Sequence, residues 1–398
     1  MGEDTDIVII GAGPYGLSIA AYLTAKKANF RIFGTPMGVW RDNMPPGMFL
    51  KSEGFASDLF DPKHEMTLEK YCAAHGHPYV HTGLPISREL FCEYGTAFQK
   101  KLVPNLEREH VVDVAPAANG FTVRLENNET FHARRVIVAA GISHYANIPP
   151  ELSKLPPDVM SHTSQQRGFD FYSGRDVAVL GAGSSAVDMA GLLHQAGART
   201  QLFTRRSKIW FHHPPVELSR LKRLKSSIMR PRSGLGLGWR SRLACDLPVV
   251  FHYLPSRFRI RVTRGHLGPS AGWVTRRLVE GKVNIRLGMT LQDAELRDGK
   301  PHLTFVNSEG KTEEVVVDQV VAGTGYKVDV ARLEFLGPEV RARIKQEQTS
   351  PVLSSNFESS VRGLYFVGAS AANSFGPLLR FAWGAKFTAR RLARHLTR

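Results

Sequence analysis

The chain has 398 residues, of which 42% are hydrophobic and 22% charged, an ordinary composition for a globular protein. At roughly 100–200 residues per domain, this length predicts two or three domains, each with its own core. No window reaches the roughly 18 consecutive apolar residues of a membrane helix. The acidic start, with Glu3, Asp4 and Asp6, is unlike a signal peptide. These features predict a cytoplasmic protein.

Cysteine and metal-ligand patterns are sparse. The three cysteines, Cys72, Cys92 and Cys245, are far apart in the sequence, and no CxxC pair is present. This spacing predicts neither a disulfide framework nor a thiolate metal site, and we expect no bound metal. It also speaks against a flavin disulfide reductase, because such an enzyme needs two neighbouring thiols.

The net charge of +16 is concentrated in one stretch. Residues 214–272 contain twelve lysines and arginines against two acids, which accounts for +10 of the total. Because prolines and glycines interrupt this stretch, it cannot be one helix, and we expect an inserted cap or substrate-access element. The short basic amphipathic stretch Leu221–Lys225 leaves contact with a membrane surface open. No nucleic-acid fold motif is present, so we expect no nucleic-acid partner.

A glycine-rich turn follows the first predicted strand. The apolar stretch Asp6–Ile10 runs into Gly11-Ala12-Gly13-Pro14-Tyr15-Gly16 and then into a helical pattern. In such a turn the first glycine permits the tight bend, the second lets a pyrophosphate approach the backbone, and the third lets helix and strand pack closely. The helix N-terminus adds N–H donors for the phosphates. We expect a dinucleotide here, although Arg31–Gly34 lacks the usual ribose-binding acid.

A second turn of the same kind follows the strand Asp176–Leu180. It reads Gly181-Ala182-Gly183-Ser184-Ser185-Ala186, and alanine is an accepted third member. The next strand ends at Arg205 and Arg206, which suit the 2′-phosphate of NADPH because guanidinium groups bind phosphate bidentately. The alternative is a solvated arginine pair. Two such turns predict a resident FAD and a visiting NADPH that delivers hydride to it.

Further stretches extend this pattern: Val136–Gly141, Ile148–Pro150, His162-Thr163, Val321–Tyr326 and Gly363–Gly368. With the two turns, they resemble the class B flavin-dependent monooxygenases, a group that includes flavin-containing monooxygenases, Baeyer–Villiger enzymes and ornithine or lysine N-hydroxylases. The F-x-G-x-x-x-H signature of that group is reduced here to His162, because Pro156 and Asp158 stand at its earlier positions. A vaguer likeness to FAD-dependent urate hydroxylases gives purines as a substrate lead.

The resemblance implies the functional residues. Lys51 and His162 are the candidate catalytic residues, and the segment Gly47–Ser52 is similar to the loop of the N-hydroxylases that faces substrate and flavin. An exposed charge for Lys51 and a structural role for His162 remain alternatives. The candidate cofactor contacts are Gly11, Gly13, Pro14, Tyr15, Gly16, Trp40, Lys51, Ser52, Val112, Ala140, Gly141, Gly181, Gly183, Ser184, Ser185, Arg205, Arg206, Gly323, Thr324, Gly368, Ala369, Pro377 and Leu378.

The order of these motifs predicts an α/β fold with two interleaved Rossmann-like dinucleotide-binding domains, for FAD and NADPH, and a small inserted cap segment. Residues 1–164 begin the FAD-binding domain, 165–314 form the NADPH-binding domain with the basic insertion 214–272, and 315–398 complete the FAD-binding domain. A hairpin is expected around Asn127-Asn128. A helix is expected from Pro377 through Ala393. The resemblance implies that its N-terminus faces the flavin, where its partial positive charge would favour an anionic reduced flavin.

The resemblance implies an FAD- and NADPH-dependent monooxygenase that forms a C4a-(hydro)peroxyflavin. Such an enzyme transfers one oxygen atom from O₂ to a small amine, sulfide or activated ring, which needs positioning and water exclusion rather than a side-chain base. This agrees with a sequence that shows no Ser/His/Asp triad and no HExxH motif. The alternative is an NAD(P)H-flavin oxidoreductase that passes electrons to an acidic protein partner. The oligomeric state stays open, with a homodimer among the options.

Overall fold

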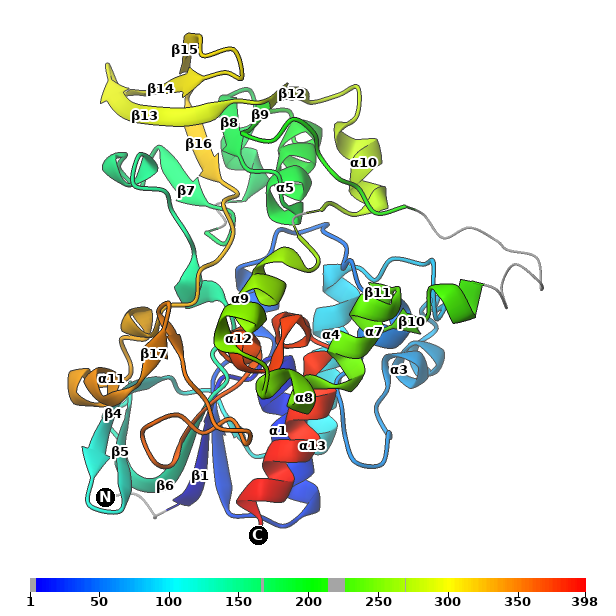
Figure 1. Cartoon of the computed structure of the whole chain (residues 1–398), viewed down its shortest axis with the longest axis vertical. Coiled ribbons are helices and arrows are strands. Elements are labelled where there is room, and N and C mark those ends of the chain that lie inside the picture. Colours follow the sequence, from blue (N-terminus) through cyan, green and yellow to red (C-terminus); the bar gives the residue numbers. More distant parts are fainter. Residues whose placement is uncertain (1–4, 166–167, 214–225, 269) are drawn as a thin grey trace.

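The computed structural model describes residues 5–165, 168–213, 226–268 and 270–398, and every structural statement below refers to these residues. The chain forms two lobes (Figure 1). The lower lobe contains both ends of the chain, and the upper lobe is formed by its middle. Each lobe is built on a sheet with parallel strands and flanking helices. The predicted α/β class is therefore confirmed.

The lower lobe is built on a seven-stranded sheet in the order β3-β2-β1-β6-β5-β4, with β19 paired to β6. Strands β1, β2, β3, β6 and β19 run parallel, whereas β4 and β5 form an antiparallel extension. The expected hairpin around Asn127-Asn128 joins β5 to β6. The strands are β1 (Thr5–Ile10), β2 (Phe30–Phe33), β3 (Leu106–Glu107), β4 (Val111–Ala117), β5 (Gly120–Leu125), β6 (Thr130–Val138) and β19 (Leu364–Phe366).

Helices from both ends of the chain cover this sheet. Helix α13 packs on α1 because Ala385, Ala389, Leu392 and Leu396 recur at helical spacing and are buried, whereas Arg390 is exposed. This contact joins the first and last thirds of the chain in one core. The helices of the lobe are α1 (Pro14–Ala25), α2 (Gly38–Asp42), α3 (Leu68–His75), α4 (Arg88–Leu102), α11 (Pro338–Arg343), α12 (Ala372–Phe375) and α13 (Gly384–Leu396).

The predicted continuous helix from Pro377 to Ala393 is wrong. The chain forms a short 3-10 helix, η7 (Pro377–Arg380), then an extended residue, Phe381, and only then α13. The hydroxyl of Tyr15 lies 3.0 Å from the carbonyl oxygen of Leu379 and 2.8 Å from that of Phe381. The Tyr15 hydroxyl thus contacts the chain on both sides of the break, and the carbonyl of Phe381 also accepts from the N–H of Gly384 (3.1 Å) at the start of α13.

The upper lobe has a five-stranded parallel sheet in the order β12-β9-β8-β16-β7. Its two faces are covered differently. Val177 and Val179 of β8 face the helix α5, whereas Ala178 and Leu180 face a three-stranded antiparallel sheet, as the two-residue period of a strand requires. The elements are β7 (Met160–His162), β8 (Asp176–Leu180), α5 (Ser184–Gln195), β9 (Arg199–Thr204), α10 (Trp273–Val279), β12 (Asn284–Leu287), β13 (Thr290–Arg297), β14 (Lys300–Val306), β15 (Thr312–Val316) and β16 (Gln319–Ala322).

Residues 226–268 of the basic insertion pack on the lower lobe, although in sequence the insertion interrupts the upper one. These residues are called the cap below. Helices α8 and α9 contact α12, Leu235 belongs to the lower-lobe core, and the guanidinium of Arg259 donates to the carbonyl of Asn373 (3.1 Å). The stretch Leu221–Lys225 lies outside the described residues. The elements of this cap are β10 (Arg232–Ser233), β11 (Gly236–Leu237), α7 (Trp239–Asp246), α8 (Pro248–His252) and α9 (Ser256–Gly265).

Candidate functional site

The first glycine turn connects β1 to α1 and leaves an open space in front of the helix. A Cβ at Gly11 would lie 2.4 Å from the carbonyl oxygen of Ala139, and the φ of Gly11 is 113°, so this position requires glycine. A Cβ at Gly16 would meet the carbonyl of Gly11. At Gly13, in contrast, no described atom lies within 4 Å of the Cβ position. Packing therefore explains Gly11 and Gly16, whereas Gly13 keeps room for an approaching group.

No side chain caps the start of α1. Gly13 is the N-cap residue, Pro14 occupies the first turn, and no cap hydrogen bond from a side chain is formed. The first N–H groups of the helix thus point into the space in front of Gly13. An anion placed there would receive these N–H groups and the positive end of the helix dipole.

Other predicted residues converge on the same sheet edge. Strands β1, β6 and β19 are parallel and end together, with Val138 opposite both Ile10 and Phe366. The turns that follow β6 and β19 therefore lie beside the turn that follows β1. A Cβ at Gly368 would contact the ring of Tyr15 (3.5 Å), which links the third of these turns to α1. The residues brought together are Ala140 and Gly141 after β6, Gly368 and Ala369 after β19, and Pro377 and Leu378 in η7.

Val112 lies on a β-bulge of β4. Val111 pairs with Leu125 and Asp113 with Arg124, so Val112 has no opposite residue in the ladder of β4 and β5. Its side chain is exposed and lines a hollow of about 680 Å³. The hollow is lined by Val111, Val112, His144, Ala331, Arg332, Glu334 and Phe335.

The sequence lacks the usual ribose-binding acid at the end of β2. In the described part of the chain, the acids close to this strand are bound to arginines. Glu107 is adjacent, on β3, but it is bound to Arg31 through Nε (2.7 Å). Arg31 also binds Glu129 (2.7 Å), and these carboxylates raise its pKa. Asp42, the next acid along the chain, pairs with Arg41 (3.1 Å). These acids are thus engaged in ion pairs of the protein.

The second glycine turn connects β8 to α5 in the upper lobe. A Cβ at Gly181 would lie 2.3 Å from the carbonyl oxygen of Gly323, and the φ of Gly181 is 144°. The third member of the turn is Ala186. Its methyl group fits because it packs against Gly323, which has no side chain. Helix α5 begins after Gly183 without a side-chain cap. The hydroxyl of Ser184 donates to the carboxylate of Asp188 (2.9 Å).

Arg205 and Arg206 stand beside this second turn. The N–H of Gly181 donates to the carbonyl of Phe203 (2.9 Å), so the ends of β8 and β9 meet at one edge. Both arginines are exposed, and within the described ranges neither takes part in an ion pair. Their guanidinium groups are thus available to a ligand on the turn.

Thr324 and His162 lie where the upper lobe is joined to the lower one. The hydroxyl of Thr324 donates to the carbonyl of Asn147. His162, at the end of β7, is fully buried, with Nδ1 2.8 Å from the hydroxyl of Ser164 and Nε2 3.1 Å from the carbonyl of Gly325. A carbonyl only accepts, so Nε2 carries the proton, and burial lowers the pKa of His162. His162 therefore orients the connection between the lobes as a neutral ring.

Lys51 lies between the lobes. Its Nζ donates to the carbonyl of Ser270 (3.1 Å), which follows the cap. Lys51 is an exposed residue, which agrees with the alternative interpretation of an exposed charge. Partial desolvation by the surrounding segments lowers its pKa, the carboxylate of Asp188 raises it, and the guanidinium of Arg380 lowers it. Asp188 is buried on α5, and Arg380 belongs to η7. Side chains from both lobes thus act on this ammonium group.

The loop that contains Lys51 contacts the upper lobe at further points. The amide of Asn43 donates to the carbonyl of Ser164 (2.9 Å), and a Cβ at Gly47 would touch Leu192 of α5 (3.5 Å). Trp40 precedes this loop and packs edge-on against Phe91, with ring centroids 4.8 Å apart. The hydroxyl of Ser52 lies 2.7 Å from that of Ser57.

Asn43, Ser270 and Arg380 are not among the functional residues predicted from the sequence. No local pattern marks them, because each reaches the site through contacts with distant segments.

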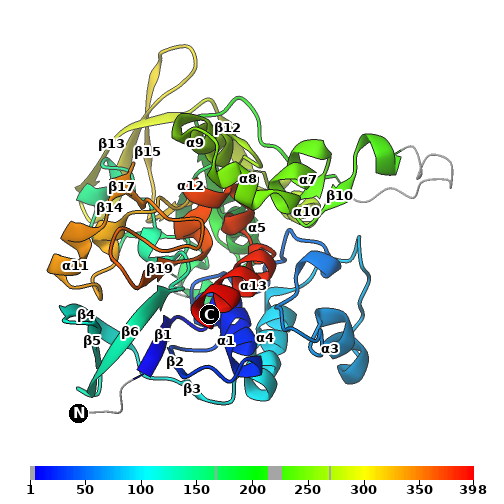
Figure 2. The same ribbon diagram turned by 60° about the horizontal axis from the view of Figure 1, so that its bottom comes forward.

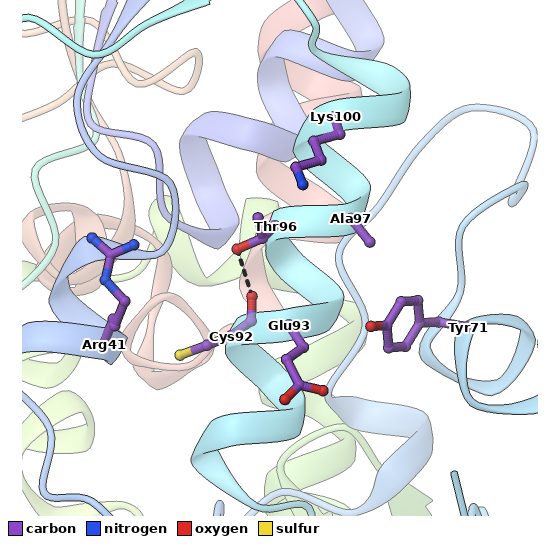
Figure 3. A pocket seen from close by; sticks show the side chains of 7 residues that line it. All are labelled: Arg41, Tyr71, Cys92, Glu93, Thr96, Ala97 and Lys100. Atoms are coloured by element: carbon purple, nitrogen blue, oxygen red, sulfur yellow. Dashed lines mark hydrogen bonds between the residues drawn. The ribbon is translucent and has the colours of Figure 1, made fainter. Parts of the chain in front are cut away.

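A separate hollow of about 390 Å³ lies beside α4 (Figure 3). It is lined by Arg41, Tyr71, Cys92, Glu93, Thr96, Ala97 and Lys100. None of the residues predicted to contact a cofactor lines it.

Within the described ranges, no group of three or more His, Cys, Asp or Glu side chains is placed to hold a metal ion. No helix in this part of the chain is long and apolar enough to cross a membrane.

Residues 8–228 match the family described as pyridine nucleotide-disulphide oxidoreductase. The chain belongs to this family. The description of this family agrees with the predicted oxidoreductase class. Among curated relatives, it is 26% identical over 241 residues to the rhizobactin siderophore biosynthesis protein RhbE of Rhizobium meliloti, covering 55% of this chain and 52% of RhbE. It is 28% identical over 231 residues to ferredoxin–NADP reductase 2 of Bacillus subtilis, covering 54% and 59%. The chain spans about half the length of the curated relatives it matches.

Among solved structures, the chain is similar to the ornithine N-hydroxylase KtzI of Kutzneria sp. 744, described with reduced FAD, NADP⁺ and L-ornithine. The TM-score is 0.78 at 16% identity, and the match covers 99% of each chain. The similarity therefore extends to both lobes and to the cap. The predicted resemblance to class B flavin-dependent monooxygenases is confirmed at the level of the fold, and the predicted pair of cofactors agrees with KtzI.

Proposed function

We propose that this chain is an FAD- and NADPH-dependent monooxygenase of the N-hydroxylase and flavin-containing monooxygenase type. The observation that supports it most is the pairing of two open glycine turns, one per lobe, with a loop that runs between the lobes. Each turn lies at the carboxyl edge of parallel strands and begins an uncapped helix. That edge is where open α/β sheets bind their ligands.

FAD would occupy the lower lobe. The N–H groups at the start of α1 would hold its pyrophosphate in front of Gly13. The bulge at Val112 would supply backbone hydrogen-bonding groups to the edge of the adenine ring. Gly141, Gly368 and residues of η7 would border the rest of the FAD molecule. When bound, the flavin accepts hydride from NADPH and activates O₂ for transfer of one oxygen atom to the substrate.

NADPH would bind on the upper lobe. The N–H groups of Ser184 and Ser185 at the start of α5 would hold its pyrophosphate. The exposed guanidinium groups of Arg205 and Arg206 would hold its 2′-phosphate. The connection oriented by His162 would keep this cofactor facing the flavin, so His162 acts in this proposal as a positioning residue.

The substrate would bind between the lobes as a small amine with an anionic group. Lys51 and Arg380 supply positive charge there, and Asp188 is held by the hydroxyls of Ser184 and Thr275. RhbE and KtzI, by their names, act in siderophore biosynthesis and on ornithine, which supports this substrate class. A sulfide or a urate-type purine remains a second candidate to be screened with the amines.

Isotopically labelled O₂ tests the proposal. The purified protein should be yellow, NADPH should bleach the flavin without oxygen, and the oxidised product should contain one labelled oxygen atom. Protein that binds no FAD, or that oxidises NADPH without labelling any candidate amine, sulfide or purine, would overturn the proposal. Mass spectrometry of the product is the readout.

The second candidate is an NADPH-flavin reductase that passes electrons to an acidic protein. It is favoured by the similarity to ferredoxin–NADP reductase 2 and by the exposed arginines of the cap. Electron transfer to added ferredoxin without oxygen, and without labelled product, would identify it. A dithiol reductase is not supported, since Cys72, Cys92 and Cys245 lie on three different helices and form no disulfide.

A further inference from the structure

The cap carries most of the large apolar side chains that the protein exposes. Of the seventeen such side chains among the described residues, nine lie within 226–268. They include the most exposed ones, with Tyr253 at 73%, Ile228 at 64% and Met229 at 62%. The nine are Ile228, Met229, Leu237, Trp239, Leu243, Leu247, Val250, Tyr253 and Phe258. This concentration is unlike the scattered apolar exposure of an ordinary surface.

Several of these side chains lie on or beside α7. Trp239 and Leu243 are four residues apart, so they share one face of this helix, and Leu247 follows directly after its end. The indole N–H of Trp239 donates to the carbonyl of Ile228 (3.1 Å), which places the start of the cap against this face. Phe251 and Ser241, in contrast, are buried toward the lower lobe. The apolar face of the cap therefore points away from the body, and α7 and β10 lie at the edge of the molecule (Figure 2).

Positive charge lies around this apolar face. The described cap residues contain eight arginines and one acid, Asp246, which pairs with Arg242, so their net charge is +7. Arg257, Arg261 and Arg264 are exposed along one side of α9, next to Phe258. Short helices that combine exposed Trp, Leu and Phe with arginines are typical of segments that lie in the headgroup region of a membrane.

We propose that the cap, residues 226–268, docks the protein on the surface of an anionic lipid bilayer. Charge decides against a second copy of this chain as the occupant, because a symmetric contact through this surface would bring +7 against +7. The exposed Trp239 and Tyr253 favour lipid over an acidic protein, because these side chains settle at the apolar–polar boundary of a bilayer. This inference does not depend on the proposed function, and lipid binding is measured without any turnover.

Vesicle co-sedimentation tests the proposal on the full chain, with phosphatidylcholine vesicles that contain or lack phosphatidylglycerol. We expect binding to the anionic vesicles that weakens as salt increases. W239S/L243S should weaken this binding about twentyfold, since each half-exposed side chain buries part of its apolar area in lipid. R257Q/R261Q/R264Q should weaken it about a hundredfold, at about fivefold per arginine near the surface.

Matched controls separate docking from general changes in polarity and charge. L296S/V316S removes two apolar side chains of similar exposure (45% each) from the three-stranded sheet of the upper lobe. R390Q/R394Q/R398Q removes three exposed arginines from the end of the chain. Both controls should bind anionic vesicles within about threefold of the unmodified protein. Thermal melting and FAD content of each variant report whether the fold is retained.

Three outcomes would overturn the proposal. The first is no binding to anionic vesicles at low salt. The second is binding that R257Q/R261Q/R264Q abolishes but W239S/L243S leaves unchanged, which would indicate a purely electrostatic surface suited to an acidic protein. The third is a dimer in light scattering that W239S/L243S converts to a monomer, which would make this surface an interface between copies.

Discussion

Replacing Arg205 and Arg206 by glutamine should shift the preference of the protein from NADPH toward NADH. Both guanidinium groups are exposed beside the second glycine turn, and within the described ranges no carboxylate pairs with them. A charge-assisted hydrogen bond contributes about 1.5–3 kcal/mol, and at an exposed site the lower end applies. Since about 1.4 kcal/mol is tenfold, R205Q/R206Q should lower kcat/KM for NADPH about a hundredfold. NADH lacks the 2′-phosphate, so its kcat/KM should change less than about twofold.

Arg199→Gln provides the matched control. Arg199 begins the same strand, pairs with Asp176 (2.7 Å), and lies about 17 Å from the strand's carboxyl end at about 3.3 Å per residue. The assay is anaerobic flavin reduction by each nucleotide, followed by stopped-flow absorbance. If R205Q/R206Q keeps its NADPH-to-NADH ratio, or if Arg199→Gln changes the ratio equally, the assignment of the 2′-phosphate to these arginines is refuted.

Gly11→Ala should abolish FAD retention and lower the melting temperature, because its Cβ would overlap the carbonyl of Ala139. Gly13→Ala should keep the apoprotein melting temperature and still weaken FAD binding, which absorbance and melting curves measure; equal melting losses in both would contradict this. Tyr15→Phe should lower the free energy of unfolding by about 1–3 kcal/mol in a denaturant titration, because two part-buried carbonyls lose its hydroxyl; an unchanged midpoint would refute it. Burial raises the pKa of Asp58 to about 6, so the folded state favours the protonated form of this carboxyl group. The free energy of unfolding is therefore higher below the ordinary pKa of 3.8 and falls as the pH rises toward 6. Asp58→Asn should therefore add up to about 3 kcal/mol of stability above pH 6 and none near pH 4, so an equal gain at both would exclude this cause.

The parts of the fold that follow from short stretches could be predicted from the sequence. Each glycine turn needs only a strand, a turn and a helix within some twenty residues, so sterics and hydrogen bonding fix it locally. The hairpin between β5 and β6 is local in the same way. These elements lie where the sequence predicts them.

The remainder depends on contacts between distant segments, which local patterns do not encode. The break after η7 lies beside a tyrosine that is more than 360 residues earlier in the chain. Lys51 meets Ser270 through a contact between segments 219 residues apart. The basic insertion shows its charge in the sequence, whereas its packing partner and its exposed apolar face depend on tertiary structure.

The contact between Tyr15 and the carbonyls after η7 has a consequence for biosynthesis. The turn after β1 leaves the ribosome early, but the carbonyl of Leu379 that contacts Tyr15 is synthesised 364 residues later. At about 5–20 residues per second, this contact can form only about 20–70 s after the turn has been made. Under the proposed function, FAD binding at this turn would therefore be a late step in maturation.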